Sequence, residues 1–216
     1  MSLERQLRLG RQIRSIGFDD APFDKARDAQ VPIAGVVCAN TRFEGLLWGR
    51  VERDGLDATE QLLALLKASK FLAQLHLILL DGIAFGGFNV VDLAALSQET
   101  GLPAVAVMRK QPRLERVIAA IHRLPDAELR TQRLRLAGSI HQGQTDSPSP
   151  LNSNTEHESS RQLGSRKLFF QVQGTNPELA ARALAQLCDR GQVPECLRLA
   201  HLIGSAVITG QSSKRA

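Results

Sequence analysis

An apolar run that ends in a carboxylate constrains the fold of this chain more than any other stretch. Residues 75–80 are apolar except for His76, and they lead directly into Asp81 and a glycine-rich turn at 82–87. A short apolar run bounded by turn residues is typical of a strand buried on both faces. Open α/β sheets bind their ligands at the carboxyl ends of such strands. We therefore expect Asp81 to lie at the functional edge of an α/β sheet.

The other predicted elements surround this strand with parallel and antiparallel neighbours. Three apolar runs joined by short polar loops predict an antiparallel meander. The next two strands, at 75–80 and 104–108, enter by right-handed crossovers and are expected to be parallel. The predicted strands are 11–18, 31–38, 45–53, 75–80, 104–108 and 167–173. The predicted helices are 58–70, 90–100, one that starts at Pro112, 126–137, 175–188 and 194–210. The predicted fold class is an α/β mixed sheet flanked by helices.

This topology can bring several acids to one edge of the sheet. If the strand before Asp81 lies beside the first strand, Asp19 or Asp20 reaches the same edge. Asp54 or Asp57, after the third strand, can approach it as well. Clustered carboxylates stay ionised together only when a cation neutralises them. The pattern therefore predicts a Mg²⁺ or Mn²⁺ site, because hard oxygen ligands suit these ions.

Such a site is suited to hydrolysis of a phosphodiester, with the metal holding a hydroxide in line with the bond and stabilising the leaving oxygen. Arg109 and Lys110 follow the strand at 104–108 and are expected to bind a phosphate. His201 is predicted to lie in the core. The turn at 82–87 lacks the Lys and Ser or Thr of a P-loop, so a nucleotide cradle is not expected.

Some of the acids have structural alternatives. Asp57 fits the N-cap of the helix at 58–70, with Glu60 completing a capping box. Asp92 fits the first turn of a helix capped by Asn89, where a carboxylate interacts favourably with the helix dipole. Asp54 stands before a glycine, which is a common turn pair. These alternatives remain open from the sequence alone.

Length and composition predict one domain, 1–216, that contains a flexible insertion. The chain has 216 residues and is 43% hydrophobic, which is enough for a core. Residues 138–165 are mostly Ser, Gln, Asn, Thr, Pro and His, and too polar to order themselves. With no apolar run long enough for a membrane helix, no signal-peptide pattern and three cysteines that cannot all pair, we expect a cytoplasmic protein.

The positive charge is concentrated in one segment. The formal net charge is +5, and residues 109–135 contain eight Lys or Arg against three acids. A basic stretch of this kind is compatible with a nucleic-acid partner, although a solvated helix face would have the same composition.

Several long motifs together resemble a known family. They are GFDDAPF at 17–23, DGLDAT at 54–59, LLDGIAFGGFNVVD at 79–92, GLPAVAVMRK at 101–110, PECLRLAHLI at 194–203 and the closing GQSSKRA. In order and in content they resemble the endonuclease dU family, also called domain of unknown function 99, which is related to endonuclease V. The resemblance covers nearly the whole chain outside 138–165.

The resemblance implies an RNase H-like fold and metal-dependent cleavage of nucleic acid at deaminated or otherwise altered bases, as part of repair. Asp19 and Asp81 resemble the first-strand acid and the Asp-Gly acid of the related endonuclease V, which also has a middle acid and a strand-end lysine. The middle acid falls near Glu52 or Asp54, and Asp54 is favoured because it belongs to this family's own motif. Lys110 resembles the strand-end lysine.

The prediction is therefore an endonuclease with Mg²⁺ or Mn²⁺ as cofactor and DNA favoured over RNA as partner. The predicted catalytic residues are Asp19, Asp54, Asp81 and Lys110, and the predicted metal ligands are Asp19, Asp20, Asp54 and Asp81. The alternative is a non-catalytic RNase H-like module that binds nucleic acid through the basic segment.

Overall fold

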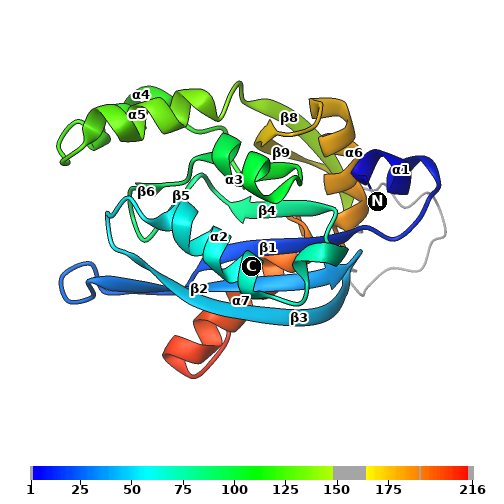
Figure 1. Ribbon diagram of the computed structural model, residues 1–216, viewed down its shortest axis with the longest axis horizontal. Helices are drawn as coiled ribbons and strands as arrows, with labels where there is room; N and C mark the ends of the chain where they lie inside the picture. The colour runs from blue at the N-terminus through cyan, green and yellow to red at the C-terminus, as the bar shows by residue number, and fades with distance from the viewer. Residues whose placement is uncertain (1, 148–163, 190, 214–216) are drawn as a thin grey trace, which may run out of the picture.

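A seven-stranded mixed sheet forms the centre of the computed structural model, which describes residues 2–147, 164–189 and 191–213 (Figure 1). The strand order is β3-β2-β1-β4-β7-β9-β8. The strands are β1 (Arg14–Asp20), β2 (Gln30–Ala39), β3 (Arg42–Glu52), β4 (Leu77–Asp81), β7 (Ala104–Met108), β8 (His141–Ser147) and β9 (Gly164–Gln173). The predicted meander of β1, β2 and β3 is antiparallel, and β4 and β7 are parallel to β1, as expected. At the far edge, β9 pairs antiparallel with both β7 and β8.

Helices cover both faces of the sheet (Figure 1). The helices are α1 (Leu3–Arg8), α2 (Ala58–Ala68), α3 (Leu93–Thr100), α4 (Leu114–Ile121), α5 (Ala127–Leu136), α6 (Pro177–Leu187) and α7 (Glu195–Thr209), with a 3₁₀ turn, η1 (Leu72–Gln74). One face carries α2 and α3, and the other carries α1, α6 and α7. The helices α4 and α5 lie side by side and form an arm at one end of the sheet. A two-stranded hairpin, β5 (Ala84–Phe85) and β6 (Asn89–Val90), follows β4.

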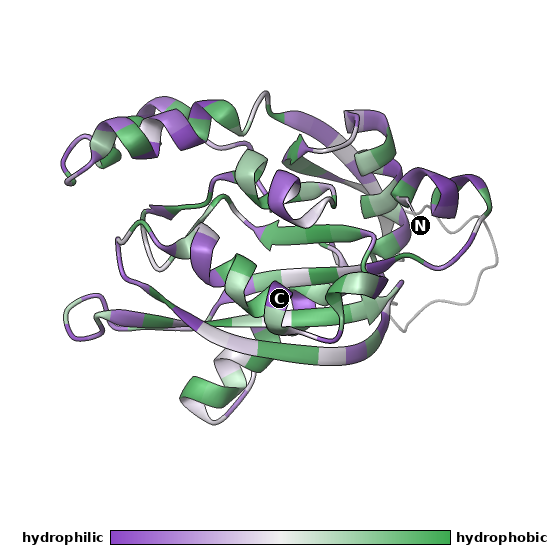
Figure 2. Ribbon diagram, viewed as in Figure 1, coloured by the Kyte–Doolittle hydropathy of each residue, from purple (hydrophilic) through white to green (hydrophobic). Residues whose placement is uncertain are grey.

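The strand β4 shows how the core is divided. Its alternate residues point to opposite faces of the sheet, so Leu77 and Leu79 pack on the α6–α7 side while Ile78 and Leu80 pack on the α2–α3 side. All four side chains are fully buried. Figure 2 shows the resulting apolar centre of the sheet. The continuous apolar sequence before Asp81 follows directly from this burial on both faces.

Three elements were not expected from the sequence. The short helix α1 buries Leu3 and Leu7, one turn apart, within a segment predicted as a polar lead. The glycine-rich turn contains the small hairpin β5–β6. The predicted insertion at 138–165 is shorter at both ends, because residues 141–147 form β8 by hydrogen bonding to β9, and β9 itself begins at Gly164. The remaining part of that prediction, at 148–163, lies outside the described residues.

The caps of α2 and α3 also differ from expectation. Asp57 occupies the N-cap position of α2, but the amide of Ala58 donates to Asn89 Oδ1 at 3.0 Å. Asp57 instead accepts a hydrogen bond from Asn89 Nδ2 at 2.6 Å. Asp92, and not Asn89, caps α3 by accepting from the amide of Ala95 at 2.9 Å. The hairpin residue Asn89 therefore joins the β6 strand to the start of α2.

None of the helices in the described part of the chain is long and apolar enough to cross a membrane.

Candidate active site

Two carboxylates lie at the carboxyl ends of the two central parallel strands. Phe18 of β1 is in register with Leu80 of β4, so Asp19 and Asp81 follow a matched pair. Both side chains also point to the same face of the sheet. Asp19 lies two residues after Gly17, which faces the backbone of α7, and Asp81 lies two residues after Leu79, which packs on that side. The predicted convergence of a first-strand acid with Asp81 therefore falls on Asp19.

His201 from α7 completes this group. Its Nδ1 atom lies 2.8 Å from Asp19 Oδ2, and its side chain is 31% exposed. The sequence prediction that placed His201 in the core missed this contact. The signal was present in the family-like motif at 194–203, where His201 follows a helical pattern that brings it to the strand end.

Arg109, which follows β7, contacts the second carboxylate. Its Nη1 atom lies 3.1 Å from Asp81 Oδ2. Its Nη2 atom is buried and has no hydrogen-bond partner among the described residues. The neighbouring Lys110 is exposed. The residue after β7 that reaches the carboxylates is therefore Arg109, while Lys110 points to solvent.

Burial and like charge act on these carboxylates. Burial, reinforced by the nearby charge of Asp19, raises the pKa of Asp81 to about 6, and Arg109 and His201 oppose that rise. The hydrogen bond to Asp19 raises the pKa of His201 above its ordinary value. The site thus holds two acids whose joint ionisation is unfavourable without a compensating cation.

Asp20 and Asp54 lie against the β5–β6 hairpin. Asp20 alternates with Asp19 and so points to the opposite face, where its Oδ2 accepts a hydrogen bond from the amide of Gly86 at 2.7 Å. Burial raises the pKa of Asp20 to about 6, although the Gly86 hydrogen bond opposes this. Asp54 Oδ1 accepts from the amide of Phe88 at 2.9 Å. The four predicted acids are therefore divided, with Asp19 and Asp81 on one face and the other two at the hairpin.

The carboxylate pair fits a divalent cation of the magnesium type. Over residues 2–147, 164–189 and 191–213, no group of three or more His, Cys, Asp or Glu side chains is arranged to hold a metal ion. Mg²⁺ commonly binds through one or two carboxylates and takes its other ligands from water and substrate phosphate. Asp19 and Asp81 supply this donor set, because they are hard oxygen ligands that a shared cation would relieve of mutual repulsion.

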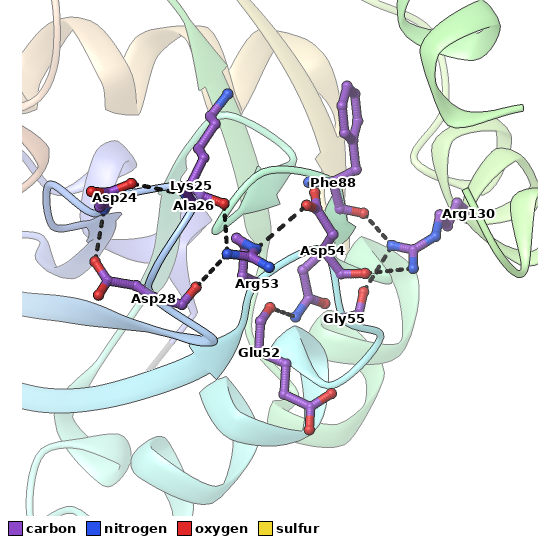
Figure 3. A network of polar contacts seen from close by, with 11 residues as sticks. Asp24, Lys25, Ala26, Asp28, Glu52, Arg53, Asp54, Gly55, Phe88 and Arg130 are labelled. Carbon is purple, nitrogen blue, oxygen red and sulfur yellow. Dashed lines mark hydrogen bonds and ion pairs between the residues drawn. The ribbon is translucent and has the colours of Figure 1, made fainter. Parts of the chain in front are cut away.

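The basic segment at 109–135 contains two kinds of arginine. Arg130 and Arg133 are buried, and they donate hydrogen bonds to backbone carbonyls near Asp54 and in the hairpin. Figure 3 shows the contacts of Arg130. The exposed basic residues in or near the arm are Lys110, Arg113, Arg116, Arg123 and Arg135. The sequence could not distinguish the buried arginines from the exposed basic residues. Their burial depends on the packing of α5 against the loop after β3 and the β5–β6 hairpin.

Comparison with known proteins gives a consistent result. A family described as Endonuclease dU matches residues 11–208. A UPF0215 protein of Methanothermobacter thermautotrophicus is 37% identical over 203 residues, which are 93% of this chain and 90% of that protein. The crystal structure of an Archaeoglobus fulgidus protein of unknown function is 33% identical, has a TM-score of 0.76, and covers 92% of this chain and 99% of its own.

A more distant structural neighbour identifies the fold. The crystal structure of Ciona intestinalis endonuclease V, bound to DNA that contains an inosine followed by a ribo-adenosine, has a TM-score of 0.52. It is 17% identical and covers 89% of this chain and 84% of its own. The similarity confirms the predicted RNase H-like fold.

Proposed function

The chain belongs to the endonuclease dU family, and from this we propose that it is a divalent-metal-dependent endonuclease that cleaves nucleic acid at deaminated or otherwise altered bases. The observation that carries the proposal is the Asp19–Asp81 pair at the carboxyl ends of adjacent parallel strands, with His201 and Arg109 in contact with it. The fold, shared with endonuclease V, is compatible with this activity.

Asp19 and Asp81 would hold Mg²⁺ or Mn²⁺, with Asp20 and Asp54 as further predicted ligands from the hairpin side. When bound, the metal supplies an activated hydroxide and stabilises the leaving oxygen of the phosphodiester. His201 fixes the orientation of Asp19 through its Nδ1 atom. Arg109 is placed to bind the scissile phosphate, because its side chain is 38% exposed and already lies beside Asp81. Lys110, which is exposed beside it, would contact a more distant phosphate.

The exposed basic residues of the arm would bind the nucleic-acid backbone. We define the basic face as Lys110, Arg113, Arg116 and Arg123, which are all exposed. These residues extend from the end of β7 along α4, so they continue outward from the carboxylate pair. Phosphate contacts of this kind fix the register of a nucleic acid without reading its sequence. DNA is the favoured substrate over RNA, and the altered base is the expected point of recognition.

The direct test is cleavage of oligonucleotides that contain a single uracil or hypoxanthine, incubated with Mn²⁺ and compared with unmodified strands. We expect cleavage next to the altered base, and a fall of at least about 100-fold in rate for Asp81→Asn, which removes one charged oxygen ligand. Cleavage by Asp81→Asn at the wild-type rate would remove Asp81 from the mechanism.

A non-catalytic nucleic-acid-binding module is the second candidate. The observation in its favour is that each carboxylate of the pair already has a cationic side chain within contact distance. This candidate predicts binding that weakens with salt and no cleavage with any altered base or divalent metal. The same oligonucleotide series therefore decides between the two functions.

A further inference from the structure

Arg130 of α5 lies at the centre of a group of backbone carbonyl oxygens (Figure 3). Its side chain is buried, although it belongs to the most basic segment of the chain. Nη1 donates to Gly55 O at 2.8 Å and to Phe88 O at 2.5 Å, and Nη2 donates to Asp54 O at 2.6 Å. Nε donates to Pro125 O at 3.1 Å, which ties the guanidinium to the start of its own helix.

These carbonyls come from two loops at the edge of the sheet where β1 and β4 end. Asp54 and Gly55 lie between β3 and α2, whereas Phe88 lies in the hairpin that follows Asp81. The two loops also contact each other directly, because the amide of Asp54 donates to Gly86 O at 2.9 Å and the amide of Phe88 donates to Asp54 Oδ1 at 2.9 Å. One guanidinium therefore holds together both sides of the junction in which the Asp54 carboxylate lies.

A planar guanidinium is suited to this position. It presents five N–H donors in a fixed plane, has no hydrogen-bond acceptor, and remains charged in proteins. A lysine ammonium carries the same charge, but it is a compact group that cannot reproduce the planar fork. A neutral side chain would leave several buried carbonyl oxygens without a partner. Arg130 is thus not interchangeable with another basic residue.

Arg133 repeats the arrangement one turn further along α5. Its Nη1 atom donates to Leu56 O and to Val90 O, each at 2.9 Å. Leu56 and Val90 belong to the same two loops that Arg130 contacts. The helix α5 therefore fixes the relative position of these loops through two arginines on successive turns. Of the two, Arg130 is the one that bonds to Asp54.

We propose that Arg130 is a positioning residue of the nuclease site, which sets the position of the Asp54 carboxylate and of the hairpin beside the Asp19–Asp81 pair. The inference rests on the proposed function and adds a role for a residue that contacts neither metal nor phosphate. Its consequence is that the metal requirement of the enzyme depends on Arg130, while contacts to the nucleic-acid backbone do not.

The test compares Arg130→Lys and Arg130→Gln with the wild-type protein. Binding of Mn²⁺ is followed by the electron paramagnetic resonance of the free ion, without nucleic acid, and the Mn²⁺ dependence of cleavage is measured separately. We expect both variants to need about 10- to 100-fold more Mn²⁺, as for other residues that orient metal ligands. The salt dependence of nucleic-acid binding should stay unchanged, because Arg130 is buried. Gln132→Ala, an exposed change on the same helix, is the matched control and should behave as wild type.

A double-mutant cycle separates positioning from general loss of stability. If Arg130 acts through Asp54, Arg130→Lys should add little to the Mn²⁺ requirement of Asp54→Asn. Each variant is measured at a temperature at which its circular dichroism shows it to be folded. Additive effects in the cycle, or an unchanged Mn²⁺ requirement in Arg130→Lys of an active enzyme, would overturn the inference alone. A wild-type protein that neither binds Mn²⁺ nor cleaves would overturn the proposed function and the inference together.

Discussion

The charged form of the Asp81 side chain is disfavoured in the folded protein. Its pKa is raised from 3.8 to about 6, first by burial and then by the charge of Asp19. The native state therefore holds this proton more tightly than the unfolded chain does. By linkage, the free energy of unfolding falls as the pH rises from about 4 to about 6, and stays lower above that range.

This linkage predicts that Asp81→Asn stabilises the metal-free protein at neutral pH. We expect a gain of about 1–3 kcal/mol at about pH 7.5 and a much smaller difference at about pH 4, where Asp81 is largely protonated. Urea unfolding in the presence of a chelator measures both values. Asp20, whose pKa is also raised to about 6, is present in both proteins, and its charge is one of the causes of the raised pKa of Asp81. A variant less stable than wild type at about pH 7.5 would show that the ion pair with Arg109 outweighs the cost of burial.

At the residue scale, the position of Asp81 at a strand end could be predicted from the sequence, whereas the contact between His201 and Asp19 could not. Asp81 could be predicted because an apolar strand that ends in a carboxylate is a local pattern. His201 could not, since its contact with Asp19 depends on how a helix 182 residues away docks on the sheet. Asp19 and Asp20 point to opposite faces of the sheet because they are adjacent residues of β1. The sequence did not place either acid in a strand, since the strand was predicted at 11–18 and β1 runs from Arg14 to Asp20.

At the scale of elements, the approach of α7 to β1 brings His201 to Asp19. Gly17 makes this approach possible, because a Cβ atom there would lie 2.7 Å from the amide nitrogen of Leu197 and 2.8 Å from the carbonyl carbon of Cys196. These are backbone atoms, which cannot move aside without shifting the helix. The backbone of Gly17 has no positive φ, so its role is close packing.

Gly17→Ala is therefore predicted to lower the free energy of unfolding by about 1–3 kcal/mol, as overpacking does elsewhere. It should also weaken the contact between His201 and Asp19, lowering the pKa of His201 toward its ordinary value, which NMR titration measures. Gly143→Ala in β8 is the matched control, since its Cβ would meet Leu168 at an ordinary 3.5 Å. Equal effects of the two substitutions would contradict a special role for the β1–α7 approach.

The sequence predicted most elements of the fold, and those it missed share a physical cause. Period-two and helical patterns reveal a strand or helix that buries an apolar face, and β2, β4, β7 and α2 all do so. In contrast, β8 has the polar sequence HQGQTDS and lies at the sheet edge, so only its pairing with β9 defines it. The cap of α2 is another tertiary feature, because its acceptor, Asn89, comes from the hairpin.

At the scale of the whole molecule, positive charge and the Asp19–Asp81 carboxylate pair occupy neighbouring regions. The basic face on α4 lies at the end of the sheet where the hairpin β5–β6 is found, whereas α1 lies at the opposite end (Figure 1). A nucleic acid that follows the basic face would be guided toward Asp81. The chain's net charge of +5 favours such an encounter at low salt.

We predict that Arg116→Gln reduces the salt dependence of nucleic-acid binding. The slope of log K against log salt should become less steep by about 0.7–0.9, the value of one lost phosphate contact. Arg8→Gln removes an equally exposed charge from α1, at the far end of the molecule, and should leave the slope unchanged. Fluorescence anisotropy over a series of salt concentrations measures both. Equal changes in slope for the two variants would indicate that net charge alone sets the salt dependence, and would contradict binding through the basic face.

The pairing of Asp19 with His201 has a consequence for protein synthesis. The two residues are 182 positions apart, so the first strand and its parallel neighbour β4 are made well before the helix that carries the histidine. A nascent chain on the ribosome, which is surrounded by RNA, therefore carries the carboxylates without their histidine. The proposed nuclease site becomes complete only after translation has passed residue 201.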